Sequence, residues 1–183
     1  QIRAEQKALE TDAATEVKMA SSSARRVVSK PCLGTAYRRD VEDWGPSSRL
    51  QEQVIELFRR LKVHPDDVLA GNLVPFRSPS EDSLQGTADA VAFGRNLWAE
   101  ILDVVRPTVV VSMGKRANSE ISGLLNVKGL KTVPVGWGTQ IASRGQLFGG
   151  HWIGLPHLSR FTIMNRQASQ SALDALFRNL AVV

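Results

Sequence analysis

The chain has 183 residues, with 43% hydrophobic residues, 22% charged residues and a net charge of +5, which fits one ordinary globular domain. No apolar run approaches the roughly 20 residues of a membrane span, and the charged first residues are unlike a secretory signal; we expect an intracellular protein, cytoplasmic or nucleoid-associated. The single Cys32 excludes an intrachain disulfide and cysteine-ligated clusters, and the scattered His64, His151 and His157 lack metal-ligand spacing, so we expect no metal and no organic cofactor.

In chain order, residues 1–46 are predicted to form a loosely structured or partly helical N-terminal extension, and residues 47–183 a folded domain. Ser47 or Ser48 is expected to cap a first helix that ends near residue 61. The next elements are a buried strand over 67–76, a helix over 87–105 with Val91 and Val105 facing inward, and a β-branched core strand over 108–113. A helix over 115–125, short strands over 131–135 and 151–155, and a last helix capped by Asn165 complete the pattern.

Strands and helices alternate along this pattern. Such alternation is typical of parallel strands that are joined by crossover helices. The sequence therefore predicts the α/β class, as a three-layer α/β/α sandwich with a short, mainly parallel central sheet. Ligands of such sheets bind outside the carboxyl ends of the strands. Three polar segments follow predicted strands and are expected to meet at one edge; they begin at Asn72, Gly114 and His157.

The positive charge is concentrated in the second part of the chain. Residues 106–183 contain nine Lys or Arg and only two acidic residues, whereas residues 1–105 have a small negative balance. A basic face attracts phosphates and steers polyanions toward the protein. The charge therefore favours a nucleic-acid partner, with a merely solvated basic surface as the alternative.

Three segments in order, AGNLVPFRSPS, W-x2-IL-x3-RPTVVVSMGKRA and GLPHLSRF, resemble the uracil-DNA glycosylase superfamily over about residues 44–180. The resemblance implies a protein that flips a base out of DNA for repair. It implies that Asn72 reads the base edge through an amide that donates and accepts, and that His157 donates to the base O2, where charge grows as the glycosidic bond breaks. The alternatives are a turn-capping Asn and a structural His.

The other candidate residues would hold the DNA. Ser159 suits a phosphate oxygen, and Arg160 or Phe161 would fill the gap that the extruded base leaves, with core packing as the alternative for Phe161. Phe76 would stack on the base. The remaining candidates suit phosphate contacts, or else a rigid loop and a solvated first helical turn; they are Arg77, Ser78, Lys115 and Arg116.

Two features depart from the family pattern. The first motif, a Gly-x-x-Pro-Gly-like loop that positions the hydrolytic water, is not found, and residues 32–35 are a poor substitute. The last motif reads His157-Leu158-Ser159 and lacks the proline that usually follows the histidine. These departures keep a second hypothesis open, a non-catalytic glycosylase-fold protein that acts as a DNA-binding or assembly subunit. An unrelated nucleotide or phosphate binder is a third, although no Gly-x-Gly-x-x-Gly or Gly-x4-Gly-Lys-Ser/Thr motif is present.

Overall fold

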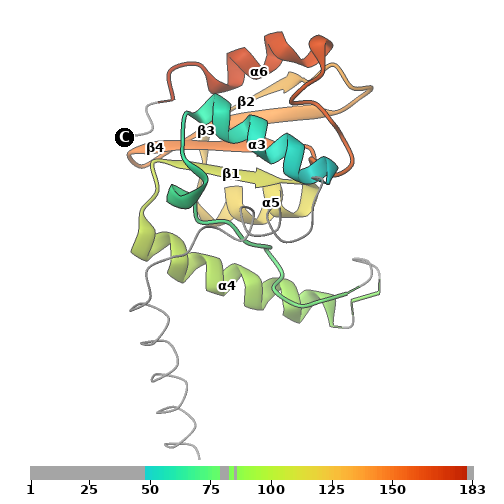
Figure 1. Cartoon of the computed structure of the whole chain (residues 1–183). Coiled ribbons are helices and arrows are strands. Elements are labelled where there is room, and N and C mark those ends of the chain that lie inside the picture. The colour runs from blue at the N-terminus through green and yellow to red at the C-terminus, as the bar shows by residue number, and fades with distance from the viewer. Residues whose placement is uncertain (1–47, 79–82, 85, 181–183) are drawn as a thin grey trace, which may run out of the picture. The chain divides into compact units, whose positions relative to one another are not determined.

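The structure, a computed structural model, describes residues 48–78, 83–84 and 86–180, which all fall in one compact unit. The expected N-terminal extension, Ser47, Cys32 and the segment 32–35 lie outside the described residues. Figure 1 shows a four-stranded sheet with helices packed against it, so the α/β class is confirmed. The strands are β1 (Val109–Met113), β2 (Lys128–Pro134), β3 (Ile141–Leu147) and β4 (Gly150–Leu155).

The sheet is mixed, with the strand order β1-β4-β3-β2. β1 and β4 pair in parallel, whereas β3 is antiparallel to both β4 and β2. The mainly parallel sheet that the sequence predicts is therefore not confirmed. The reason is a consecutive antiparallel run from β2 to β4, in which tight turns replace crossover helices.

The helices agree well with the sequence pattern. They are α3 (Arg49–Leu61), α4 (Thr87–Val105), α5 (Lys115–Leu124) and α6 (Gln170–Phe177), with 3-10 turns η1 (Pro65–Asp67) and η2 (Gln167–Ser169). Ser48 caps α3 through a capping box with Gln51, as expected for a Ser-x-x-Gln start. In the part of the chain that the structure describes, no helix is long and apolar enough to cross a membrane.

The two faces of β4 contact different helices. Ile153 and Leu155 are fully buried in a cluster with apolar residues of α3 and α6. Trp152 points to the opposite face, where its indole nitrogen donates to Ser112 of β1, which in turn bonds to Asn118 of α5. Helix α4 packs against α5. Both faces of β4 are therefore covered, which explains why its sequence is almost continuously apolar.

The predicted strand over 67–76 does not form. After η1, the segment 68–78 is irregular and runs along α4, where the Leu73 carbonyl lies against Gly94 and the Asn72 carbonyl accepts a hydrogen bond of 3.1 Å from the Trp98 indole. A strand needs a neighbouring strand to satisfy its backbone groups, whereas this segment lies against a helix, whose Trp98 side chain bonds the Asn72 carbonyl.

The structure differs from the sequence prediction at three further places. The strand β3 was not predicted, because its polar residues Ser143, Arg144 and Gln146 hide the strand pattern. Asn165 does not cap the last helix; it lies exposed in a turn, and α6 begins at Gln170 after η2. Val105 is half exposed at the end of α4 rather than facing inward.

Candidate functional site

The carboxyl ends of β1 and β4 lie side by side because these strands are parallel, and this brings Gly114 against His157. The Gly114 amide donates to the Leu155 carbonyl at 2.9 Å, which continues the pairing one residue past the strand. Gly114 has φ of +91°, and a Cβ there would lie only 3.3 Å from the His157 Cδ2. Glycine therefore allows both the backbone turn and the close approach of the imidazole. Two of the three predicted segments thus meet as expected.

The imidazole of His157 has a defined tautomer. The backbone N–H of Ser159 donates to the His157 Nδ1 at 3.3 Å, and the Ser159 hydroxyl lies 2.7 Å from the same nitrogen. The Nδ1 that accepts this N–H carries no proton, which leaves Nε2 as the ring nitrogen that can donate. Within the described residues, Nε2 has no hydrogen-bond partner, and the side chain is exposed. The site therefore offers the Nε2 of His157 to solvent as an N–H donor.

One buried leucine holds the loop that carries these residues. Leu158 is fully buried, whereas His157 before it and Ser159 and Arg160 after it are exposed. The amides of Arg160 and Phe161 both donate to the His157 carbonyl, at 3.0 and 3.1 Å, and close a tight turn. The turn therefore directs polar side chains outward from a fixed base.

Further along, the buried Gln53 of α3 fixes the end of this loop. Its side-chain oxygen accepts a hydrogen bond of 2.7 Å from the amide of Met164, and both residues are nearly inaccessible to solvent. A buried amide that lost this acceptor would be left unsatisfied, at a cost of about 1–3 kcal/mol. The loop is thus attached to the helix on that face of the sheet.

A chain of hydrogen bonds fixes the strand ends from the opposite face. The Asn118 amide donates to the Leu155 carbonyl at 3.0 Å, and its oxygen accepts from Ser112 at 2.8 Å. Ser112 in turn accepts from the Trp152 indole at 3.0 Å. The network joins β1, β4 and α5 directly beneath Gly114 and His157, and positions them relative to one another.

Phe161 lies in packing contact rather than free at the surface. It is half-buried, its ring meets Trp137 at a centroid distance of 6.2 Å in a T-shaped arrangement, and it packs against the core cluster. Arg160, by contrast, is exposed. Of the two candidates for filling the gap in a duplex, Arg160 is the accessible one.

Asn72 lies in the irregular segment along α4, and its residue is exposed. No hydrogen bond joins it to His157 among the described residues; its backbone carbonyl is bound by Trp98. The sequence placed Asn72 at a strand end beside His157, but the strand is absent, so the sheet does not bring the two residues together.

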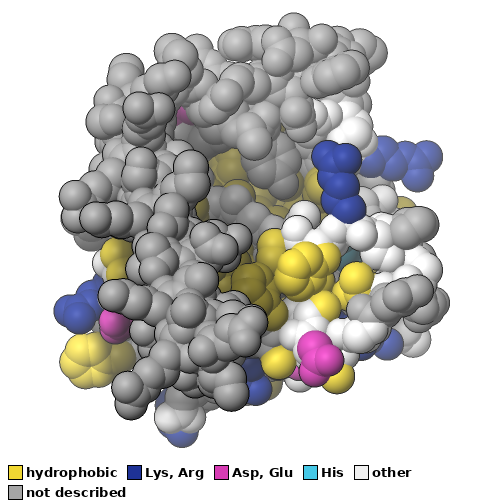
Figure 2. Space-filling model, turned by 90° about the horizontal axis from the view of Figure 1, so that it is seen from below, with side chains coloured by type: hydrophobic (Ala, Val, Ile, Leu, Met, Phe, Trp, Pro, Cys, Tyr) yellow, Lys and Arg dark blue, Asp and Glu magenta, His cyan; other side chains and the backbone are white. Residues whose placement is uncertain are grey.

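Phe76, Arg77 and Ser78 lie beyond Asn72, at the start of α4. They line an open hollow of about 670 Å³. The Phe76 ring lies 5.3 Å from that of Phe93, and both residues are about half exposed. Figure 2, which looks onto the molecule from below, shows hydrophobic side chains on this side. These residues form a group of their own, attached to α4.

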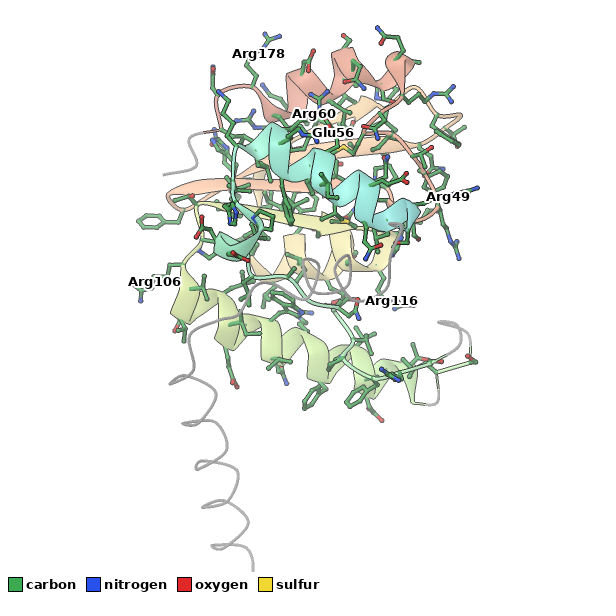
Figure 3. The ribbon with its side chains drawn as sticks, viewed as in Figure 1. Arg49, Glu56, Arg60, Arg106, Arg116 and Arg178 are labelled. Atoms are coloured by element: carbon green, nitrogen blue, oxygen red, sulfur yellow. The ribbon has the colours of Figure 1, made fainter. Side chains whose placement is uncertain are left out.

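Lys115 and Arg116 begin α5 directly after Gly114 and are exposed. Figure 3 shows Arg116 at the same end of the molecule as Arg49, which begins α3, while Arg106 and Arg178 lie at the opposite end. Positive side chains therefore flank the strand ends at which His157 lies.

In the described ranges, no group of three or more His, Cys, Asp or Glu residues is arranged to hold a metal ion. Comparison with protein-family models, with characterised proteins and with solved structures gives no match for this chain.

Sequence reasoning missed the residues that support the site, chiefly Gln53 and Asn118. A signal existed for Asn118, because helical spacing puts it on the same side of α5 as the buried Ile121. Gln53 lies between the apolar positions Leu50, Val54 and Leu57 of α3, and a polar residue on such a stripe indicates a specific buried partner.

Proposed function

We propose that this chain is an intracellular DNA glycosylase of the uracil-DNA glycosylase type, which flips a uracil-like, damaged or modified base and hydrolyses its N-glycosidic bond. The observation that carries the proposal is the His157 ring, whose Nδ1 is held by Ser159 and whose Nε2 is left to donate, at the carboxyl edge of β1 and β4. The three-layer arrangement belongs to the same proposal, supported by α3 and α6 on one face of β4 and α5 on the other.

The proposed chemistry needs a donor whose effect grows along the reaction. As the glycosidic bond breaks, negative charge moves onto the base, and its O2 becomes a better acceptor. A fixed N–H at the His157 Nε2 would stabilise that charge more in the transition state than in the bound substrate.

The other residues have supporting roles in this proposal. Lys115, Arg116, Arg160 and the Ser159 hydroxyl would contact phosphates near the strand ends. Asn72 would read the base only if the segment along α4 brings its amide toward His157. The water-positioning group is not assigned.

The direct test measures base release from single-stranded and duplex oligonucleotides that carry uracil or a modified base. His157→Ala is expected to lower the rate of release by about 10²- to 10³-fold, the usual effect of removing one such donor, with little change in DNA affinity. His64→Ala is the matched control, because His64 lies in the turn before η1 and is bonded to Asp66. Normal DNA binding by the wild-type protein without any abasic product would rule out the enzyme.

The position of Asn72 favours a second candidate, a glycosylase-fold protein that binds DNA or assembles on it without catalysis. Base recognition by the amide requires a firm position, and the exposed irregular segment provides none from the sheet. This candidate predicts that His157→Ala changes neither base release nor affinity, whereas removing Arg160 weakens binding.

A further inference from the structure

The turn between β2 and β3 lies at the same sheet edge as His157. Pro134, at the end of β2, pairs with Ile141 at the start of β3, and Ser143 of β3 pairs with Gly154 near the end of β4. The antiparallel pairing thus brings residues 135–140 to the edge where β1 and β4 end. Trp137 is in this turn.

Trp137 is part of a small stack of side chains. The Arg166 guanidinium lies over the indole, 4.7 Å from the ring centroid, and the Phe161 ring meets the indole at 75°. Arg166 is exposed, and its guanidinium pairs with no carboxylate among the described residues. A flat cation is therefore held against an aromatic ring, next to the loop that carries His157.

The charge around this stack has one sign. Three segments meet at the edge: 113–119 after β1, 134–141 between β2 and β3, and 156–170 after β4. Together they contain no Asp or Glu, and their basic residues are Lys115, Arg116, Arg160 and Arg166. Such an edge attracts a polyanion and not a cation or a basic peptide.

Aromatic rings and guanidinium planes are surfaces on which unpaired bases stack, and stacking tolerates any base sequence. In a duplex the bases cover one another's faces, so a stacking surface of this kind favours a single strand. Phosphates on either side of the stacked base would lie near the four basic residues.

We propose that Trp137 and Arg166 form a stacking platform for an unpaired nucleotide of single-stranded DNA, beside the site at His157. The platform extends the proposed function, on which it rests for the identity of DNA as the partner. It adds a preference for single-stranded over duplex DNA, and it places the strand over the β2–β3 turn.

The experiment measures binding of a fluorescein-labelled oligodeoxythymidine by fluorescence anisotropy at several salt concentrations. Trp137→Ala is expected to weaken binding about 5- to 150-fold, the range for loss of one stacked base, with an unchanged salt dependence. Trp137→Phe should retain most of the affinity, because a smaller ring still stacks. Arg166→Ala should weaken binding and also reduce the slope of log K against log salt by about 0.7, the loss of one phosphate contact.

Arg178→Ala is the matched control, since it removes the same charge at the opposite end of the molecule. Thermal melting identifies any variant that is unfolded, and if Trp137→Ala fails to fold, Arg166→Ala decides. The platform is overturned if the folded Trp137→Ala or Arg166→Ala variant binds like the wild type, or if the wild type does not prefer the single strand to the duplex.

Base release by the same variants separates this inference from the proposed function. Trp137-dependent binding without base release would leave the platform in place and remove the glycosylase. Base release together with binding that is unaffected by the Trp137→Ala and Arg166→Ala substitutions would support the glycosylase and remove the platform.

Discussion

The side-chain amide of Asn118 joins α5 to both strands that end at the site. Its two ends are used in opposite senses: the nitrogen donates to Leu155 and the oxygen accepts from Ser112. Leu155 precedes His157 by two residues, so Asn118, together with the Gly114 amide, holds the point where the loop leaves the sheet. An aspartate of the same shape would place an acceptor against the Leu155 carbonyl, which is why the amide is specific.

Replacing Asn118 by alanine is therefore expected to lower the free energy of unfolding by about 1–3 kcal/mol, since partly buried groups lose their partners. It should also loosen the His157 ring. Denaturant unfolding measures the first effect, and ¹⁵N NMR of the imidazole measures the second as a loss of the single Nε2–H tautomer. Ser119→Ala, an exposed neighbour on the same helix, is the control and should stay within about 0.5 kcal/mol of wild type. A fixed tautomer in Asn118→Ala would contradict the positioning role.

Among the elements, α4 and the segment 68–78 lie unusually close together, because Gly94 has no side chain at the point of contact. A Cβ at this position would overlap the Leu73 carbonyl oxygen, so the segment can approach the helix only over a glycine. The contact is the structural alternative to the strand that the sequence predicts.

The Gly94→Ala variant is expected to be less stable by about 1–3 kcal/mol, the usual cost of overpacking, although alanine is the better helix former by about 1 kcal/mol. Gly123→Ala in α5 is the matched control, because a Cβ there meets no described atom within 4 Å. It should be neutral or stabilising by up to about 1 kcal/mol. Thermal or denaturant unfolding compares the two, and equal effects would mean that the contact with Leu73 is not tight.

The same elements show what the sequence can specify. Helix α3 was predictable because its signals are local: the Ser48 cap and a stripe of apolar residues on its inward side. The strand over 67–76 was not, because a short apolar run such as Leu73-Val74 can equally lie against a helix. β3 was missed because its polar residues hide the strand alternation, even though its partner β4 follows directly in a hairpin. The meeting of Gly114 and His157 was predictable, since it needs only β1 and β4 in parallel, whereas Asn72 needed the strand that is missing.

The β3–β4 hairpin and the end of α6 meet through Arg144, which gives this junction a pH dependence. The Arg144 guanidinium donates to the carbonyls of Leu176 and Arg178, at 3.0 and 2.6 Å, and lies beside the His151 ring. Burial, and then the charge of Arg144, lower the pKa of His151 below its ordinary 6.5. A second positive charge at the junction is therefore unfavourable.

As the pH falls below about 6.5, the unfolded chain binds a proton at His151 that the folded chain resists, so stability should decrease until the lowered pKa is passed. His151→Gln lacks this titration. Denaturant unfolding at pH 8 gives the change in unfolding free energy caused by the substitution itself, because at that pH His151 is neutral in both the folded and the unfolded wild type. Between pH 7 and pH 5 the difference between wild type and variant should move in favour of the variant. A difference that is independent of pH would contradict the link.

For the whole molecule, the distribution of charge over the sheet is uneven. The three segments at the edge where β1 and β4 end contain four basic and no acidic residues. They therefore hold four of the nine Lys and Arg residues found from residue 106 onward. At the other end of the sheet, Lys128 begins β2, and Arg178 follows α6. Binding of a polyanion should therefore depend on which end loses charge, not only on the net charge of the protein.

Duplex DNA binding at this edge should show a slope of log K against log salt of about −3.6, if each of four basic residues displaces the counterion of one phosphate. Lys115→Ala with Arg160→Ala should reduce the magnitude of the slope by about 1.8, since two contacts are lost. The control pair, Lys128→Ala with Arg178→Ala, removes the same two charges from the opposite end and should leave the slope unchanged. Equal slopes for the two double variants would mean that DNA responds to net charge alone, and that the edge at His157 is not where it binds.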